Sequence, residues 1–190
     1  MYSSYRENNF GEILYETVLE FPPRIAVELG VLEGFSTIAI ARALYMLNTG
    51  HLDAYDIWED YEYRHSTQKE VQETIDGCGL SDFVTLHKQD AYTVHENYED
   101  RSVHLLHIDI SNDGDVFNTM LANWDSKVSH CGLILFEGGS EERDKVEWMV
   151  KYNKKPIRPE ISNNQLANTN YIYGGYNAFP SLTVMKKITL

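Results

Sequence analysis

Ile25-Ala-Val-Glu-Leu-Gly-Val-Leu-Glu-Gly-Phe-Ser-Thr37 is the most informative stretch of this 190-residue chain. Its apolar first residues predict a strand, and the alanine-rich apolar run that follows the stretch predicts a helix. Gly30 and Gly34 have no Cβ, so a ligand can approach the backbone closely between these two elements. Ser36 and Thr37 are residues that favour a helix start. A strand, a glycine turn and a helix N-terminus together indicate an open α/β sheet that holds a nucleotide-type cofactor.

The spacing of the glycines excludes two common phosphate-binding turns. A dinucleotide-binding turn needs glycines at its first, third and sixth positions, which here are Gly30, Leu32 and Phe35. A phosphate-binding loop needs a Lys directly after its second glycine, and Phe35 stands there instead. Glu33 would also bring a carboxylate to the place of a pyrophosphate, and like charges repel strongly in a poorly solvated turn. The turn therefore predicts a nucleoside cofactor without phosphates, and nearby carboxylates favour a cationic one.

A second predicted strand, residues 51–56, ends in an acidic residue. Asp56 follows the glycine turn at about the interval, roughly 20 residues or somewhat more, where such folds place a ribose-binding carboxylate. A carboxylate there can accept hydrogen bonds from both ribose hydroxyls. Trp58 has two open interpretations: it covers an adenine face, or it packs in the core.

The glycine turn, in the pattern E-L-G-x-x-x-G-x-S-T, resembles the first motif of class I S-adenosylmethionine-dependent methyltransferases. Within that class it resembles the small-molecule O-methyltransferase group related to macrocin O-methyltransferase and the cephalosporin-hydroxylase-like proteins. Those proteins share the acidic residue before the glycine, here Glu28, and the Gly-Phe-Ser-Thr run. The resemblance implies that Glu28, Gly30, Gly34 and Ser36 belong to a site for S-adenosylmethionine, which is a cationic nucleoside without phosphates.

The same resemblance assigns a role to the end of a third predicted strand, residues 83–88. An Asp at this place in the family meets the adenine amino group, and here that Asp is Asp90, followed by Ala91. Asp90 can equally cap the next helix. The order of glycine turn, ribose acid and adenine acid supports the cofactor assignment, because open α/β sheets bind ligands at the carboxyl ends of their strands.

The fourth and fifth predicted strands, residues 102–109 and 131–137, end in Asp109 and Glu137. The resembling family commonly has I-D-G-D-H at the fourth strand end, and Asp followed by Asp or Asn at the fifth, and these carboxylates hold a divalent metal. Here a serine and Asn112 replace the second acid and the histidine, and a glycine follows Glu137.

Two assignments of these strand ends stay open. Asp109 and Glu137, with Asn112, could form an oxygen-ligand site for Mg²⁺, although this ligand set is thinner than the family's. Alternatively Asp109 or His107 is the general base for the acceptor, and Glu137 orients it. Buried strand histidines are usually structural donors, so Asp109 is the stronger candidate for the base. We expect the base assignment and no metal.

The alternation of strands and helices predicts an α/β, Rossmann-like three-layer sandwich, whose mostly parallel sheet has an antiparallel C-terminal strand. We expect one domain over residues 1–190, with a lead-in helix within residues 1–22. Residues 153–180 lack clear periodicity and are expected to form a loop that shapes the substrate site. The expected helices lie near 10–19, 35–47, 66–77, 114–124 and 141–152, and the expected strands near 24–30, 51–56, 83–88, 102–109, 131–137 and 181–188, the last as an edge strand.

The composition of the chain excludes some classes of binding partner. The formal net charge of -13 would repel a nucleic-acid backbone or an anionic membrane surface. Cys78 and Cys131 are expected to be reduced, buried thiols without a disulfide. No secretory leader and no apolar run of membrane length is apparent, so we expect a cytoplasmic protein. The basic residues within 151–190 are interpreted as a solvated edge with gatekeeping lysines, or alternatively as an anion-binding substrate wall.

The function expected from these observations is S-adenosylmethionine-dependent methyl transfer to a small hydroxylated or amino metabolite. Two alternatives are a protein that binds the cofactor without turnover, because the strand-end residues depart from the family, and an NAD-dependent oxidoreductase. The latter would need a glycine in place of Leu32. The acceptor, the pathway and the oligomeric state are not fixed by the sequence.

Overall fold

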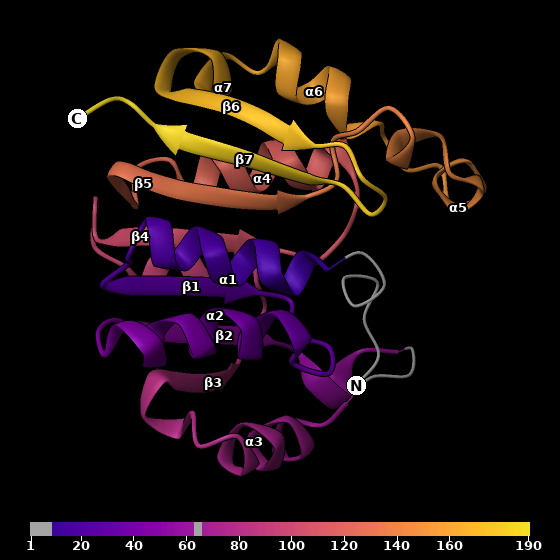
Figure 1. Ribbon diagram of the computed structural model, residues 1–190. Coiled ribbons are helices and arrows are strands. Elements are labelled where there is room, and N and C mark those ends of the chain that lie inside the picture. Colours follow the sequence, from indigo (N-terminus) through magenta and orange to yellow (C-terminus); the bar gives the residue numbers. More distant parts are fainter. Residues whose placement is uncertain (1–8, 63–65) are drawn as a thin grey trace. The chain divides into compact units, whose positions relative to one another are not determined.

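The computed structural model describes residues 9–62 and 66–190. The chain forms two compact units, whose boundary in the sequence lies between Val94 and His95. Both units alternate strands and helices (Figure 1), which confirms the expected α/β class. A single domain over residues 1–190 stays a prediction, and residues 1–8 of the expected lead-in segment lie outside the described residues.

The first unit contains, in chain order, α1 (Phe10–Glu20), β1 (Ile25–Leu29), α2 (Phe35–Leu47), β2 (His51–Asp56), the 3₁₀ turn η2 (Trp58–Asp60), α3 (Gln68–Gly77), the 3₁₀ turn η3 (Ser81–Phe83) and β3 (Val84–Lys88). The 3₁₀ turn η4 (Val94–Asn97) lies at the boundary. The second unit contains β4 (Val103–Ile108), α4 (Gly114–Trp124), β5 (Val128–Glu137), the 3₁₀ turn η5 (Arg143–Lys145), α5 (Glu147–Lys151), α6 (Ile157–Asn163), α7 (Gln165–Asn170), β6 (Tyr171–Tyr176) and β7 (Leu182–Lys187).

The strands of the first unit are parallel and lie in the order β3-β2-β1. In the register of β1 and β2, Leu29 pairs with Tyr55, so the glycine turn after β1 lies beside Asp56, the last residue of β2. Four consecutive residues of β1 are buried, as expected for a parallel strand covered on both faces. This register places the turn after β1 beside the end of β2.

Helices α1 and α2 pack against each other in the first unit. The buried residues Phe10, Leu14 and Val18 of α1 recur every four positions and form one apolar face. Helix α3 begins with a capping box, in which the Thr67 hydroxyl accepts from the Glu70 N–H and the Glu70 carboxylate accepts from the Thr67 N–H. The predicted helices at 10–19, 35–47 and 66–77 are thus confirmed, with their ends shifted by no more than two residues.

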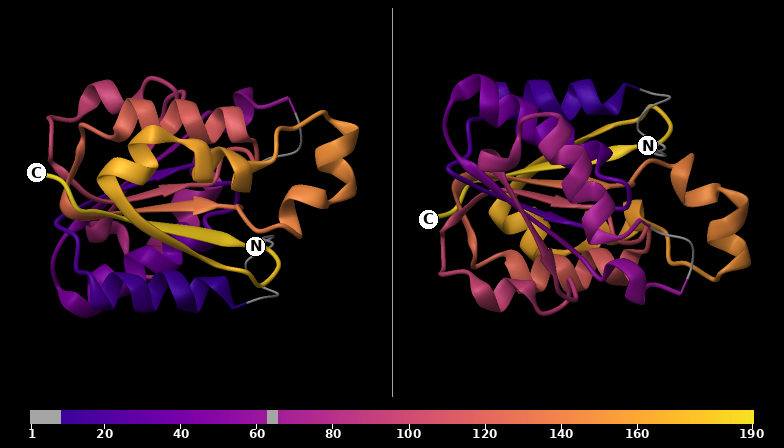
Figure 2. Two further views of the ribbon diagram at one scale, coloured as in Figure 1. Left: turned by 90° about the horizontal axis from the view of Figure 1, so that it is seen from above. Right: turned by 90° about the horizontal axis from the view of Figure 1, so that it is seen from below.

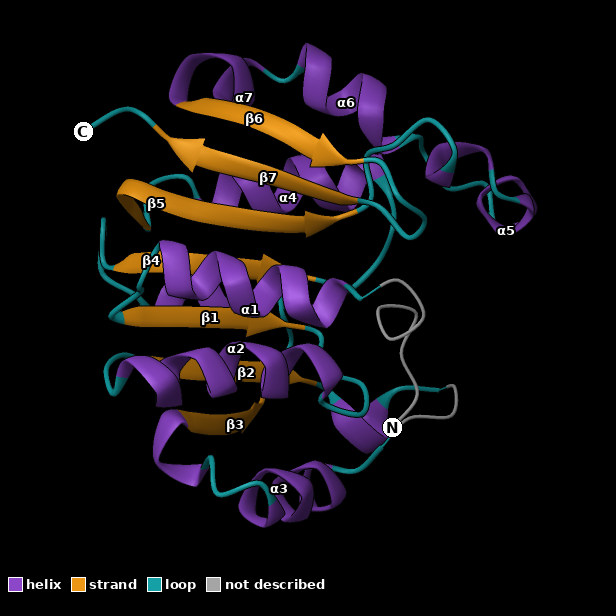
Figure 3. Ribbon diagram, viewed as in Figure 1, coloured by secondary structure: helices purple, strands orange, loops and turns teal. Residues whose placement is uncertain are grey.

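The strands of the second unit lie in the order β4-β5-β7-β6. β4 and β5 are parallel, whereas β7 is antiparallel to both β5 and β6 (Figure 3). Helices α4, α6 and α7 pack against one another beside these strands (Figure 2). The prediction of mostly parallel strands with an antiparallel C-terminal strand is confirmed.

The prediction for residues 153–180 was wrong in its secondary structure. This segment contains α6, α7 and β6, and its buried residues are Ile157, Ile161, Ala167, Tyr171 and Pro180. Each helix has fewer than eight residues, so the sequence shows too few turns for a helical period. The expected helix at 141–152 is likewise broken into η5 and the five-residue α5.

The final strand is not an edge strand, because β6 covers its outer side. Lys187 of β7 is consequently 5% exposed rather than solvated. Its ammonium group donates to the Asp125 backbone carbonyl and lies 3.6 Å from the Asp125 carboxylate. The Asn170 side chain also donates to that carboxylate. Burial, with the nearby Asp125 charge, raises the pKa of the Tyr171 hydroxyl far above its usual range.

Cys78 and Cys131 are both free and exposed, so the expectation of buried thiols was wrong. Cys78 is the C-cap just beyond the last residue of α3, and Cys131 has a left-handed φ of 62° in an exposed part of β5. Among the helices within 9–62 and 66–190, none combines the length and the apolar character that crossing a membrane requires.

We predict that Lys187→Met destabilises the protein by about 2 kcal/mol, because it leaves the half-buried Asp125 carboxylate without its cationic partner. Lys186→Met, one position earlier on the same strand, is the control and should cost less than about 1 kcal/mol. Urea unfolding followed by circular dichroism measures both free energies. Equal losses in the two variants would contradict the role given to the buried pair.

Candidate functional site

The turn between β1 and α2 has three residues in the left-handed region. Gly30 has a φ of 90°, Leu32 of 53° and Gly34 of 82°. The Gly30 N–H donates to the Tyr55 carbonyl of β2 at 2.9 Å, and the Gly34 N–H donates to the Val31 carbonyl at 2.8 Å. The turn is therefore held to the end of β2 and closed on itself before α2 begins.

Asp56, at the end of β2, holds this turn from its other side. One carboxylate oxygen, Oδ2, accepts from the Val31 N–H at 2.8 Å and from the Leu32 N–H at 3.2 Å. The other, Oδ1, accepts from the Trp58 N–H at 3.0 Å. The Asp56 side chain thus joins the glycine turn to the chain that leaves β2, and the residue is only 9% exposed.

Two of the amides that Asp56 accepts from belong to residues with an unfavourable backbone. Leu32 and Trp58 both have a φ of 53°, which costs a residue with a side chain roughly 1–2 kcal/mol. Hydrogen bonds to a carboxylate are stronger than neutral ones and offset this cost. The aspartate that the sequence assigned to ribose therefore also stabilises the turn itself.

The remaining predicted residues of the turn are buried. Glu28 is fully buried, and its carboxylate accepts a hydrogen bond from the Thr37 hydroxyl on the first turn of α2. Ser36 is 5% exposed on the same helix turn. The half-buried Glu33 adds another carboxylate to this turn. Glu28, Glu33 and Asp56 give the turn the negative character that suits a cationic cofactor.

The adenine-side candidates are less clearly built for a ligand. Trp58 is fully buried and donates its indole N–H to the His87 carbonyl at 3.0 Å, which is the core-packing interpretation. Asp90 is exposed, and its carboxylate accepts from the Tyr92 N–H at 3.0 Å, as a turn cap does. Ala91 is half-buried beside it. Their contacts with adenine stay predictions.

The catalytic candidates lie at strand ends of the second unit. His107 is fully buried within β4, whereas Asp109 is half-buried just after that strand. Glu137 ends β5 and is 6% exposed. Because Asp109 is partly exposed and His107 is fully buried, Asp109 is the better placed of the two to meet an acceptor.

Arg143, a residue that the sequence analysis did not identify, binds the carboxylate at the end of β5. Its Nη2 donates to Glu137 Oε1 at 2.9 Å, and its Nε donates to Asn112 Oδ1 at 3.0 Å. The side chains of this ion pair are 11% and 7% exposed. The guanidinium carbon lies 5.1 Å from the Trp148 ring centre and 5.2 Å from that of Phe179. Arg143 thus unites two strand ends that are 25 residues apart.

This arrangement does not fit a divalent metal. Glu137 and Asn112, two of the three candidate ligands, already direct an oxygen at the guanidinium. A divalent ion at these oxygens would have to compete with a fixed positive charge, which repels it. Within the described residues there is also no group of three or more His, Cys, Asp or Glu side chains that could hold a metal.

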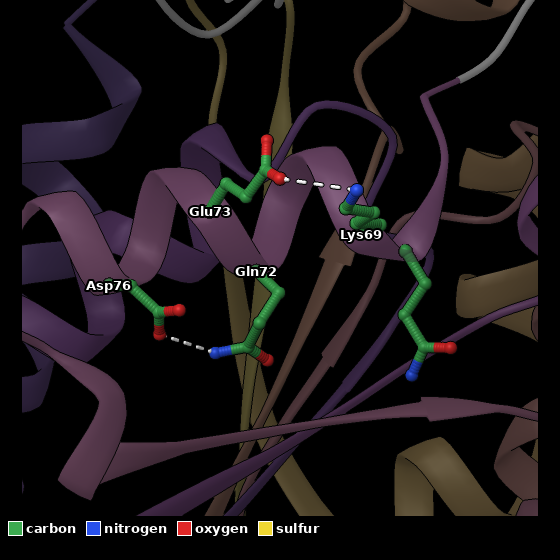
Figure 4. A pocket seen from close by; sticks show the side chains of 5 residues that line it. Lys69, Gln72, Glu73 and Asp76 are labelled. Carbon is green, nitrogen blue, oxygen red and sulfur yellow. Dashed lines mark hydrogen bonds and ion pairs between the residues drawn. The ribbon is translucent and has the colours of Figure 1, made fainter.

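A shallow depression on α3 is lined by Gln68, Lys69, Gln72, Glu73 and Asp76 (Figure 4). Its side chains pair with one another, Lys69 with Glu73 at 3.7 Å and Gln72 with Asp76 at 2.8 Å. All five belong to one helix, and none was assigned to the cofactor. We give this surface no part in the candidate site.

A family model described as a methyltransferase domain matches residues 27–137. These residues extend from β1 to Glu137 and make up more than half of the chain. The chain belongs to this methyltransferase family. It is a class I S-adenosylmethionine-dependent methyltransferase domain, as the glycine turn predicted. No significant match was found among curated proteins.

Several solved structures resemble this methyltransferase. A Podospora anserina methyltransferase bound to S-adenosylhomocysteine has a TM-score of 0.71 at 15% identity, covering 100% of this chain and 80% of the other. The O-methyltransferase of tomaymycin synthesis from Streptomyces achromogenes, in complex with S-adenosylmethionine, has a TM-score of 0.69 at 16% identity. The match covers 98% of this chain and 86% of the other. A Bacillus cereus O-methyltransferase in complex with S-adenosylhomocysteine has a TM-score of 0.68 at 18% identity. The match covers 95% of this chain and 81% of the other. These likenesses confirm the Rossmann-like fold.

Arg143 had no recognisable signal in the sequence of this methyltransferase. It follows Glu137 by six residues in a stretch with Gly138, Gly139 and Ser140, which predicts a loop rather than a partner for the strand end. The fold of that loop is what returns the guanidinium to Glu137. Its backbone N–H donates to the Ser140 hydroxyl at 3.1 Å, which helps to fix this return.

We predict that Asp56→Ala lowers the free energy of unfolding by about 2–3 kcal/mol, because three backbone N–H groups lose a charged acceptor. It should also weaken S-adenosylhomocysteine binding sharply, since the turn loses its support. Asp53→Ala on the same strand is the control, because the Asp53 carboxylate lies 2.8 Å from the half-exposed imidazole of His87 and does not support the turn. Calorimetric titration and thermal unfolding of both variants test this, and an Asp56→Ala protein with unchanged stability and affinity would refute it.

We predict that Gly34→Val abolishes cofactor binding. Gly34 has a left-handed φ, and a Cβ on it would lie 2.8 Å from Val71 Cγ1 of α3. Gly79→Val is the matched control, because Gly79 has a similar φ of 69° but open space around it. Both variants should lose stability through backbone strain. Only Gly34→Val should lose S-adenosylhomocysteine binding in calorimetry; normal binding would reduce Gly34 to part of a generic turn.

Proposed function

We propose that this chain transfers the methyl group of S-adenosylmethionine to a hydroxyl group of a small metabolite. The observation that carries the proposal is the family match over residues 27–137, which includes the glycine turn, Asp56, Asp109 and Glu137. The likeness of the turn to the macrocin O-methyltransferase and cephalosporin-hydroxylase-like group supports a small hydroxylated acceptor. The net charge of -13 argues against a nucleic-acid acceptor.

The glycine turn is proposed to hold the cofactor. Gly30 and Gly34 keep side chains away from it, and the carboxylates of Glu28, Glu33 and Asp56 stabilise its positive charge. Asp56 already accepts three backbone hydrogen bonds, so we expect it to support the turn and to accept from one ribose hydroxyl rather than two. Bound S-adenosylmethionine supplies an activated methyl group on a sulfonium.

The protein then has to deprotonate and orient the acceptor. As the acceptor oxygen forms its bond to the methyl carbon, the carbon–sulfur bond breaks and its electron pair stays on sulfur, which yields S-adenosylhomocysteine. Asp109, half-buried at the end of β4, takes the acceptor proton. Glu137 is held by Arg143, so its role is to fix the guanidinium rather than to act as a second base. Holding the acceptor in line and excluding water supplies much of the acceleration.

A cofactor-binding protein without turnover is the second candidate, because the strand ends differ from those of the resembling family. Release of S-adenosylhomocysteine from S-adenosylmethionine, followed with a panel of small hydroxylated compounds, distinguishes the two. Turnover with any member of the panel supports the proposal. Tight cofactor binding with no turnover across the panel favours the second candidate.

We predict that Asp109→Asn lowers turnover by roughly 10²–10⁴-fold while cofactor affinity changes less than about twofold, because a general base is lost and the glycine turn is untouched. Asp115→Asn, an exposed carboxylate on α4 that pairs with Lys155, is the control and should keep its activity. Activity should also survive EDTA. Activity that disappears with EDTA and returns with Mg²⁺ would overturn the base assignment in favour of a metal site.

A further inference from the structure

Within residues 9–62 and 66–190, the Arg143 guanidinium has an edge without a protein partner. Of its five N–H groups, one on Nε and one on Nη2 donate to Asn112 and Glu137. Among the described residues, both N–H groups of Nη1 and the second of Nη2 have no partner. Nη1 is not fully buried, and the Arg143 side chain as a whole is 11% exposed. The end of the guanidinium therefore keeps N–H donors that a ligand could use, whereas its side is bound.

This edge is rigidly placed. The Arg143 side chain is only 11% exposed, and two hydrogen bonds fix the orientation of its plane. Trp148 and Phe179 lie near the guanidinium, with their ring centres 5.1 and 5.2 Å from its central carbon. These rings stabilise the cation and limit its hydration, which strengthens a hydrogen bond to an incoming anion. Phe179 itself is 44% exposed and offers an apolar surface beside the open edge.

The open edge has the geometry of a carboxylate receptor. Parallel N–H groups on Nη1 and Nη2 match the two oxygens of a carboxylate, and such paired hydrogen bonds give both affinity and orientation. A lysine or a metal ion would supply charge without this fixed fork. A planar organic group attached to the carboxylate would then lie against the exposed aromatic ring.

We propose that Arg143 binds a carboxylate on the methyl acceptor, so that the acceptor is a small hydroxylated acid with a planar or aromatic body. This inference names the substrate class of the proposed function and rests on it. Arg143 supplies the positive charge at the strand ends, and Glu137 and Asn112 aim it. The acceptor is held by its acid group, and its hydroxyl is the oxygen that is methylated.

The test uses the full chain saturated with S-adenosylhomocysteine and two probes, 4-fluorobenzoate and its neutral analogue 4-fluorobenzamide, followed by ¹⁹F NMR titration. We expect the benzoate to bind at least tenfold more tightly than the amide. Arg143→Gln should reduce this preference to less than twofold, and Arg143→Lys should recover only part of it, because the charge returns without the fork. Arg158→Gln, which removes an exposed charge from α6, is the matched control and should leave the preference unchanged.

Equal binding of the two probes to the unmodified chain, or no binding of either, would overturn the inference whether or not the variants fold. An equal loss in Arg143→Gln and Arg158→Gln would also overturn it, because it would reflect general electrostatics. These outcomes are independent of the proposed function. A clear benzoate preference without turnover on any hydroxylated compound supports the anion site and counts against methyl transfer, whereas turnover on neutral acceptors without the preference does the reverse.

Discussion

The Asp56 carboxylate is the interaction on which the cofactor turn depends. It accepts hydrogen bonds from Val31, Leu32 and Trp58, and two of these three residues have a left-handed backbone. Without this acceptor, nothing would offset the free-energy cost of the unpaired N–H groups or that of the left-handed backbone. A conformation that is unfavourable for leucine is thus stabilised by a side chain from the next strand. The glycines permit the turn, and the aspartate determines which of its permitted shapes forms.

The fold could be predicted where hydrophobic periodicity is long and regular. Helix α1 belongs to this group, because its buried residues Phe10, Leu14 and Val18 recur every four positions. β1 and α2 were recognisable instead as a short and a long mostly apolar run on either side of the glycine turn. The C-terminal part could not be predicted in the same way. β6 has only one buried residue, Tyr171, so it shows no alternation, and it is a strand because it pairs with β7. The burial of Lys187 follows from that pairing and is invisible in the sequence.

The sequence predicted where the candidate site residues lie, but not which residues they contact. Asp56, Asp109 and Glu137 could be predicted, because each stands where an apolar run that predicts a strand ends. What each carboxylate contacts depends on loops. Trp58 is an aromatic residue of the kind that stacks on adenine. Its indole N–H nevertheless donates to the carbonyl of His87, 29 residues later in the chain. Arg143 reaches Glu137 through a turn that contains two glycines, and no periodicity describes such a path.

The residues that follow β4 and β5 constrain one another. Gly138 has a φ of 109°, and a Cβ on it would lie 2.4 Å from Asn112 Oδ1, so an acid or an Asn at position 138 would displace Asn112. Asn112 in turn accepts from Arg143 Nε, and Glu137 accepts from its Nη2. Restoring the second acid after Glu137 would therefore break the contact that aims the guanidinium. The planar guanidinium donates from fixed positions, so the hydrogen bonds of this cation have direction. Gly138, Asn112 and the ion pair of Arg143 with Glu137 therefore depend on one another.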